Sequence, residues 1–78
     1  MSPQAAKILV EEIMPIIEGT TYRTVRPLPT EDHEEVLQDT LASAAEMIDS
    51  VERAGKLHEV RPNSIAFYAI QRSKSARR

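Results

Sequence analysis

The segment from residue 32 to residue 55 most strongly constrains the fold, because its side chains follow the 3.6-residue period of an α-helix. Asp32 (or Thr30) is placed to cap the start of this helix, and Gly55 is placed to end it. On a helical wheel the core-forming side chains fall within an arc of roughly 140°, and they are Val36, Leu37, Thr40, Leu41, Ala44, Met47, Ile48 and Val51. Polar side chains fill the opposite arc, so this segment predicts an amphipathic helix that packs on other elements.

The segment before it, from Pro3 to Glu18, has the same period and Ser2 as a suitable N-cap. Pro15 falls on the polar side, which predicts a solvent-side kink rather than a break. Gly19 is expected to end the helix. Ile8 is predicted to lie on the polar side, whereas the apolar arc holds Ala5, Ala6, Leu9, Val10, Ile13, Met14, Ile16 and Ile17.

Residues 20–29 predict either one more helical turn or an extended connector that packs Tyr22, Val25 and Leu28 on the core. A further helix is expected from Pro62-Asn63-Ser64 through the apolar run 65–70, because no partner strand is visible elsewhere. Helices are therefore predicted near residues 3–18, 31–54 and 63–74. The fold class is all-α, a compact bundle of three helices, or of four if a short piece forms around Tyr22.

The chain has 78 residues, no cysteine and a formal charge of −2, but its charge is uneven. Residues 1–71 hold six basic and twelve acidic residues, a charge of −6. The other four basic residues follow: Arg72, Lys74, Arg77 and Arg78. We interpret residues 1–71 as a helical bundle domain and residues 72–78 as a basic tail that continues the last helix. Such a tail suits either a phosphate-bearing partner or the negative end of a helix dipole.

Several classes of function are disfavoured by the sequence. No apolar run approaches the ~20 residues of a membrane span, so we expect a soluble, cytoplasmic protein. His33 and His58 are 25 residues apart, and the consecutive residues 32–35 point in different directions on a helix. We therefore predict no metal site. There is no glycine-rich phosphate loop and no serine near a histidine, so we expect no cofactor and no enzymatic activity.

One stretch of the second helix has a specific resemblance. Residues 32–44 read Asp-His-Glu-Glu-Val-Leu-Gln-Asp-Thr-Leu-Ala-Ser-Ala, and they resemble region 2 of the bacterial sigma-70 family of transcription factors, its extracytoplasmic-function group above all. That region commonly reads Asp-Ala-Glu-Asp-Leu-Val-Gln-Asp/Glu-Thr-Phe-Leu-Arg-Ala. The identical residues are Asp32, Glu34, Gln38, Asp39, Thr40 and Ala44. Residues 11–17 and 66–72 resemble the family's first and third helices more loosely, so the resemblance spans residues 5–78.

The resemblance implies a sigma region-2-like transcription module that docks on the clamp of the largest RNA polymerase subunit and contacts single-stranded promoter DNA. The implied polymerase-binding residues are Glu35, Gln38 and Asp39, for which a solvated face is the competing interpretation. The implied nucleic-acid-binding residues are Phe67, Tyr68, Arg72, Lys74, Arg77 and Arg78. Core packing is the competing role for Phe67 and Tyr68, since the chain has only three aromatic residues.

A second class of function stays open beside the first. A small domain has a thin core, and association supplies burial that one chain lacks. The wide apolar arc of the first helix, together with Ile8 on its polar side, would fit such a contact. The alternative is therefore a helical interaction protein, a regulator or a homo-oligomer that binds no nucleic acid.

Overall fold

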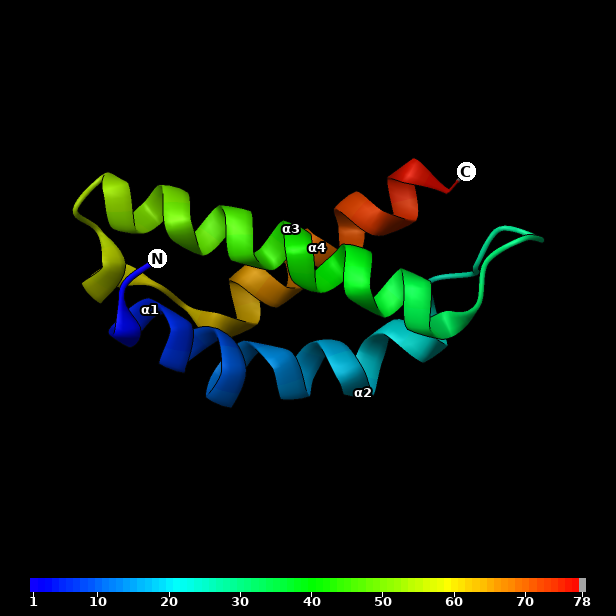
Figure 1. Ribbon diagram of the computed structural model, residues 1–78, viewed down its shortest axis with the longest axis horizontal. Helices are drawn as coiled ribbons and strands as arrows, with labels where there is room; N and C mark the ends of the chain where they lie inside the picture. The colour runs from blue at the N-terminus through cyan, green and yellow to red at the C-terminus, as the bar shows by residue number, and fades with distance from the viewer. Residues whose placement is uncertain (78) are drawn as a thin grey trace.

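The computed structural model describes residues 1–77, which fold into three helical arms without a strand (Figure 1). The predicted all-α bundle is thus confirmed. The first arm runs along the lower edge of Figure 1, α3 lies antiparallel above it, and α4 crosses behind α3. In chain order the elements are α1 (Pro3–Ile8), a π-helical turn η1 (Leu9–Ile13), α2 (Met14–Thr24), α3 (His33–Arg53), a short 3₁₀ turn η2 (Leu57–Glu59) and α4 (Pro62–Ala76).

The core lies where the three arms meet. Its main cluster of buried side chains joins Ala5, Ile13 and Ile17 of the first arm to Leu37, Ala44 and Ile48 of α3 and to Ile65, Ala66 and Ala69 of α4. A second cluster joins Val25, Val36 and Ile70. The alanines let the helices approach closely, and the isoleucines fill the space between them.

The ends of α3 follow the predicted signals. The Asp32 side chain accepts a hydrogen bond of 2.9 Å from the Glu35 amide, which makes Asp32 the N-cap. At the other end Gly55 has a φ of +74°. The Gly55 amide donates to the Glu52 carbonyl and the Lys56 amide to the Val51 carbonyl, the pair of bonds that defines a Schellman cap.

The first arm corrects two predictions. The π turn η1 inserts about one extra residue, and the Met14 amide accordingly donates to the carbonyl of Leu9, five residues earlier. This rotates α1 relative to α2. Ile8 therefore packs against the main core cluster rather than lying on a polar side. Val10, expected in the apolar arc, is instead 53% exposed.

The helix also continues past Gly19, so the prediction that it ends there is wrong. α2 reaches Thr24, and the extra helical turn was one of the two alternatives that the sequence left open. Of the three side chains expected to pack there, Val25 is buried, whereas Tyr22 and Leu28 are exposed. The predicted fourth piece around Tyr22 is therefore the end of α2 and not a separate helix.

Candidate functional site

The face of α3 that carries the predicted polymerase-binding residues is polar and exposed. Glu35 and Gln38 are both exposed, and the Gln38 side-chain amide donates a hydrogen bond of 3.1 Å to Glu34. Their spacing of three residues places them as neighbours on one helical face. Neither side chain contributes to the core, so the fold leaves both available for contact with a partner.

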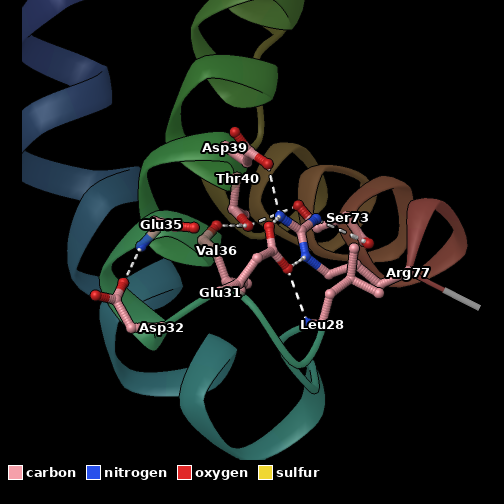
Figure 2. Close-up of polar contacts among 9 residues, drawn as sticks. All are labelled: Leu28, Glu31, Asp32, Glu35, Val36, Asp39, Thr40, Ser73 and Arg77. Atoms are coloured by element: carbon pink, nitrogen blue, oxygen red, sulfur yellow. Dashed lines mark hydrogen bonds and ion pairs between the residues drawn. The ribbon is translucent and has the colours of Figure 1, made fainter.

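Asp39, the third predicted residue of this face, is engaged within the molecule. Its Oδ2 atom lies 2.6 Å from the Arg77 Nη2 atom, although the Asp39 side chain remains 64% exposed. Arg77 was predicted to contact nucleic acid. The structure thus pairs one residue predicted to meet polymerase with one predicted to meet DNA (Figure 2).

Arg77 is held mainly by Glu31, in the connector before α3 (Figure 2). Its Nε and Nη2 atoms donate to the two carboxylate oxygens of Glu31 at 2.8 and 2.7 Å, and its Nη1 atom donates to the Ser73 carbonyl. Glu31 also accepts a hydrogen bond from the Leu28 amide. The Arg77 side chain is only 6% exposed as a result.

The same contacts change the acidity of Glu31. The hydrogen bonds from Arg77, and after them the Leu28 amide, hold the pKa of the Glu31 carboxyl below its ordinary value. Arg77 is thus charge-compensated by two carboxylates and has little capacity left for a phosphate. Arg78, the last predicted nucleic-acid-binding residue, lies outside the described residues.

Phe67 and Tyr68 do not pack in the core, which excludes the competing role for them. Phe67 is 57% exposed and Tyr68 is 59% exposed. Their rings meet edge to face with centroids 5.6 Å apart. Neighbouring residues of a helix point about 100° apart, so the two rings present separate faces to solvent. Each exposed ring offers its own face on which a planar group can stack.

Each ring borders its own hollow in the surface. Tyr68 lines one of about 330 Å³, whose rim includes Lys56 and Arg61. Phe67 lines another of about 260 Å³ between α2 and α4, whose far end reaches Lys74. The sequence reasoning missed Lys56 and Arg61, because only the turn η2 and the start of α4 bring them beside Tyr68.

The two remaining tail residues differ from each other. The Arg72 guanidinium lies 3.3 Å from a carboxylate oxygen of Glu46, and both side chains are largely exposed, so this pair is a weak surface contact. Lys74 forms no ion pair with any of residues 1–77. Of the predicted basic residues that the structure describes, Lys74 is therefore the one with an uncompensated charge.

Residues 1–77 contain no group of three side chains from histidine, cysteine, aspartate and glutamate that could hold a metal ion. None of their helices is long and apolar enough to cross a lipid bilayer. His33 packs against Tyr22, with ring centroids 4.7 Å apart and ring planes inclined by 43°.

Comparison of the chain with protein-family models, curated protein sequences and solved structures returned no match. Of the residues identical to the sigma-70 pattern, some have structural roles here: Asp32 caps α3, Thr40 hydrogen-bonds to Ser73, and Ala44 is fully buried. Gln38 has no such role, and packing does not require its identity.

Proposed function

We propose that the chain is a sigma-70 region-2-like transcription module, which docks on the clamp of the largest RNA polymerase subunit and contacts single-stranded promoter DNA. The proposal begins from the resemblance of residues 32–44 to the family. It draws support from the placement of the two implied contact surfaces on different helices, α3 for polymerase and α4 for DNA. A module whose contact surfaces lie on different helices can hold both partners at once, and here the two surfaces meet where Asp39 pairs with Arg77.

One observation carries the DNA part of the proposal, namely the exposure of Phe67 and Tyr68. Two large aromatic side chains of a small domain are expected in its core, where they bury the most apolar area. Leaving both more than half exposed forgoes that stabilisation. Stacking of unpaired bases on aromatic rings is a sequence-tolerant interaction that uses such exposed faces.

The polymerase part is supported by the polar face of α3. Glu35 and Gln38 are its exposed members without a core contact, and Asp39 completes the face while bonded to Arg77. An acidic and amide surface suits a basic patch on a partner, since charge-assisted hydrogen bonds at an interface centre are strong.

The second candidate function, an interaction protein without nucleic-acid binding, has its own supporting observation. Val10 is exposed on the first arm, although its neighbours Leu9 and Ile13 pack in the core. An exposed valine beside a core-facing stripe suits contact with a second helix. Under this alternative the chain self-associates or binds a helical partner through the first arm.

The decisive experiment captures bacterial core RNA polymerase on the immobilised chain and compares the wild type with Glu35→Ala/Gln38→Ala. Glu11→Ala/Gln4→Ala is a matched control that removes the same groups from the first arm. We expect the α3 variant to lose polymerase and the control to retain it. Absence of capture by the wild type would refute the polymerase part, and sedimentation of the wild type as a dimer that Val10→Lys dissociates would favour the second candidate.

A further inference from the structure

Two basic residues from distant parts of the chain share a hollow, and the predicted nucleic-acid-binding residues include Lys74 but not Arg26. Arg26 follows the end of α2, Lys74 lies in the last turn of α4, and both line a hollow of about 240 Å³ together with Thr24, Val25 and Arg77. Neither Arg26 nor Lys74 forms an ion pair within residues 1–77. Glu31 and Asp39 compensate the charge of Arg77. The uncompensated positive charge of this hollow is therefore that of Arg26 and Lys74.

This basic hollow adjoins the hollow beside Phe67. Thr24 and Lys74 line both, so the two hollows are neighbours along the side of α4 that faces the end of α2. Ile16, Thr20 and Thr24 recur every four residues along one wall, and Phe67, Ile70 and Lys74 form the other. We call the two neighbouring hollows together the α2–α4 groove. It has the exposed ring of Phe67 in one part and the cations Arg26 and Lys74 in the other.

The length of the groove sets what can occupy it. Phe67 and Lys74 are seven residues apart on α4, about 10.5 Å at 1.5 Å per residue, and lie on nearly the same side of the helix. Stacked nucleotides place phosphates about 3.4 Å apart along a strand, so this length corresponds to about three of them.

We infer that the α2–α4 groove binds one strand of single-stranded nucleic acid, with a base on the face of Phe67 and a backbone phosphate between Arg26 and Lys74. The inference rests on the nucleic-acid part of the proposed function and makes it specific. It adds Arg26 as a phosphate-binding residue and removes Arg77 from that role. An acidic protein segment would satisfy the two cations but would leave the face of Phe67 without a planar partner.

The test measures anisotropy of a fluorescein-labelled oligothymidylate of about eight nucleotides, within the ~4–16 that small binding modules cover. Each phosphate contact contributes about 0.7 to the slope of log affinity against log salt for a single strand. Arg26→Ala/Lys74→Ala should reduce the magnitude of that slope by about 1.4. The matched variant Lys7→Ala/Arg23→Ala removes the same charge from exposed positions outside the groove and should change the slope little.

The aromatic end is tested separately. Phe67→Ala should weaken binding by roughly 5- to 150-fold, the loss that follows removal of one stacking partner. Phe67→Leu keeps an apolar side chain and should show a similar loss, which separates stacking from any effect on folding. Tyr22→Ala removes an exposed aromatic ring of α2 outside the groove and is the control.

The outcomes separate this inference from the proposed function. If the oligonucleotide binds and Arg26→Ala/Lys74→Ala behaves like its matched control, the groove is refuted while DNA binding stands. If polyglutamate displaces the oligonucleotide and its own binding needs Arg26 and Lys74 but not Phe67, the groove serves an acidic protein and the inference fails. If the wild type binds no oligonucleotide, the inference and the DNA part of the function fail together, and polymerase capture is decided independently.

Discussion

The Arg77 guanidinium donates two parallel hydrogen bonds to the Glu31 carboxylate, 46 residues earlier in the chain. The pair joins the end of α4 to the connector that precedes α3, and Asp39 of α3 adds a third carboxylate oxygen to the same guanidinium. Glu31 in turn closes its own connector by accepting from the Leu28 amide. One arginine therefore fixes three segments relative to one another.

We predict that Arg77→Lys lowers the midpoint of urea unfolding, because an ammonium cannot reproduce the two parallel bonds that a guanidinium makes to a carboxylate. Arg72→Lys is the matched control. Its partner Glu46 is exposed and the pair makes one long contact, so the midpoint should stay nearly unchanged. Equal midpoints for the two variants would show that the Arg77 pair contributes no more than a surface contact.

The lowered pKa of Glu31 predicts how stability depends on pH. A carboxyl whose pKa is lower in the folded state binds fewer protons there than in the unfolded chain. Its contribution is complete above the unfolded value of about 4.3 and is lost as the pH falls through the lower folded value. We expect Glu31→Gln to be less stable than wild type at neutral pH, and the difference to shrink on acidification. Chemical unfolding at a series of pH values measures this difference in stability. A difference that stays constant with pH would contradict a lowered pKa of Glu31 in the folded protein.

The sequence predicted α3 closely because its determinants are local. Asp32 caps the helix and Gly55 ends it through bonds within one turn, and the apolar stripe faces the core as the period requires. The first arm was predicted less well. The π turn before Pro15 shifts the register by about one residue, and no simple period reveals such an insertion. That shift buries Ile8 against the core and exposes Val10.

The candidate site also has one part that the sequence predicts and one part that only the packing of the helices determines. Residues on one helical face, such as Glu35 and Gln38, could be grouped from their spacing alone. The pairing of Arg77 with Glu31 and the meeting of Arg26 with Lys74 depend on where α4 crosses the other arms. Nothing in the local sequence around these residues encodes that crossing. A basic tail therefore looked uniform in sequence, although the structure divides it into compensated and uncompensated charges.

The two glycines should respond oppositely to alanine. Gly19 lies inside α2, and a Cβ atom there would meet nothing within 4 Å. Gly19→Ala should therefore stabilise the protein by about 0.5–1 kcal/mol, the cost of glycine in a helix. Gly55 has a left-handed φ of +74°, so Gly55→Ala should destabilise by roughly 1–2 kcal/mol. Urea unfolding checks both, and the same sign for the two variants would contradict this account.

Two buried threonines offer a second matched pair. The Thr40 hydroxyl lies 2.7 Å from the Ser73 hydroxyl and donates to the Val36 carbonyl, whereas Thr21 Oγ1 has no hydrogen-bond partner among residues 1–77. Thr40→Val leaves Ser73 buried without its partner and should cost about 1–3 kcal/mol. Thr21→Val removes an unsatisfied hydroxyl and should be neutral or stabilising by up to ~2 kcal/mol. Differential scanning calorimetry separates the two, and a loss of stability on Thr21→Val would show that its hydroxyl is satisfied.

The last prediction concerns the double variant Gln38→Ala/Asp39→Ala on the proposed polymerase surface. Gln38 is exposed, and within residues 1–77 its side chain hydrogen-bonds only to Glu34, so its loss should be nearly neutral for folding. Asp39 loses its contact with Arg77, but its side chain is 64% exposed and Glu31 still holds the guanidinium. The cost to stability should therefore stay within about 1 kcal/mol.

Capture of polymerase should respond far more strongly than folding. Loss of charge-assisted contacts at an interface centre can weaken binding by about 2 kcal/mol or more, roughly 30-fold. Asp39 has an internal role, its pair with Arg77, and a proposed role in contacting polymerase. Arg77→Ala distinguishes them, because it breaks the internal pair while leaving the Asp39 carboxylate on α3. We expect Arg77→Ala to keep polymerase capture and Gln38→Ala/Asp39→Ala to lose it. If both variants lose capture to the same degree, the internal pair and not the α3 surface supports binding, and Asp39 acts by holding α4 in place.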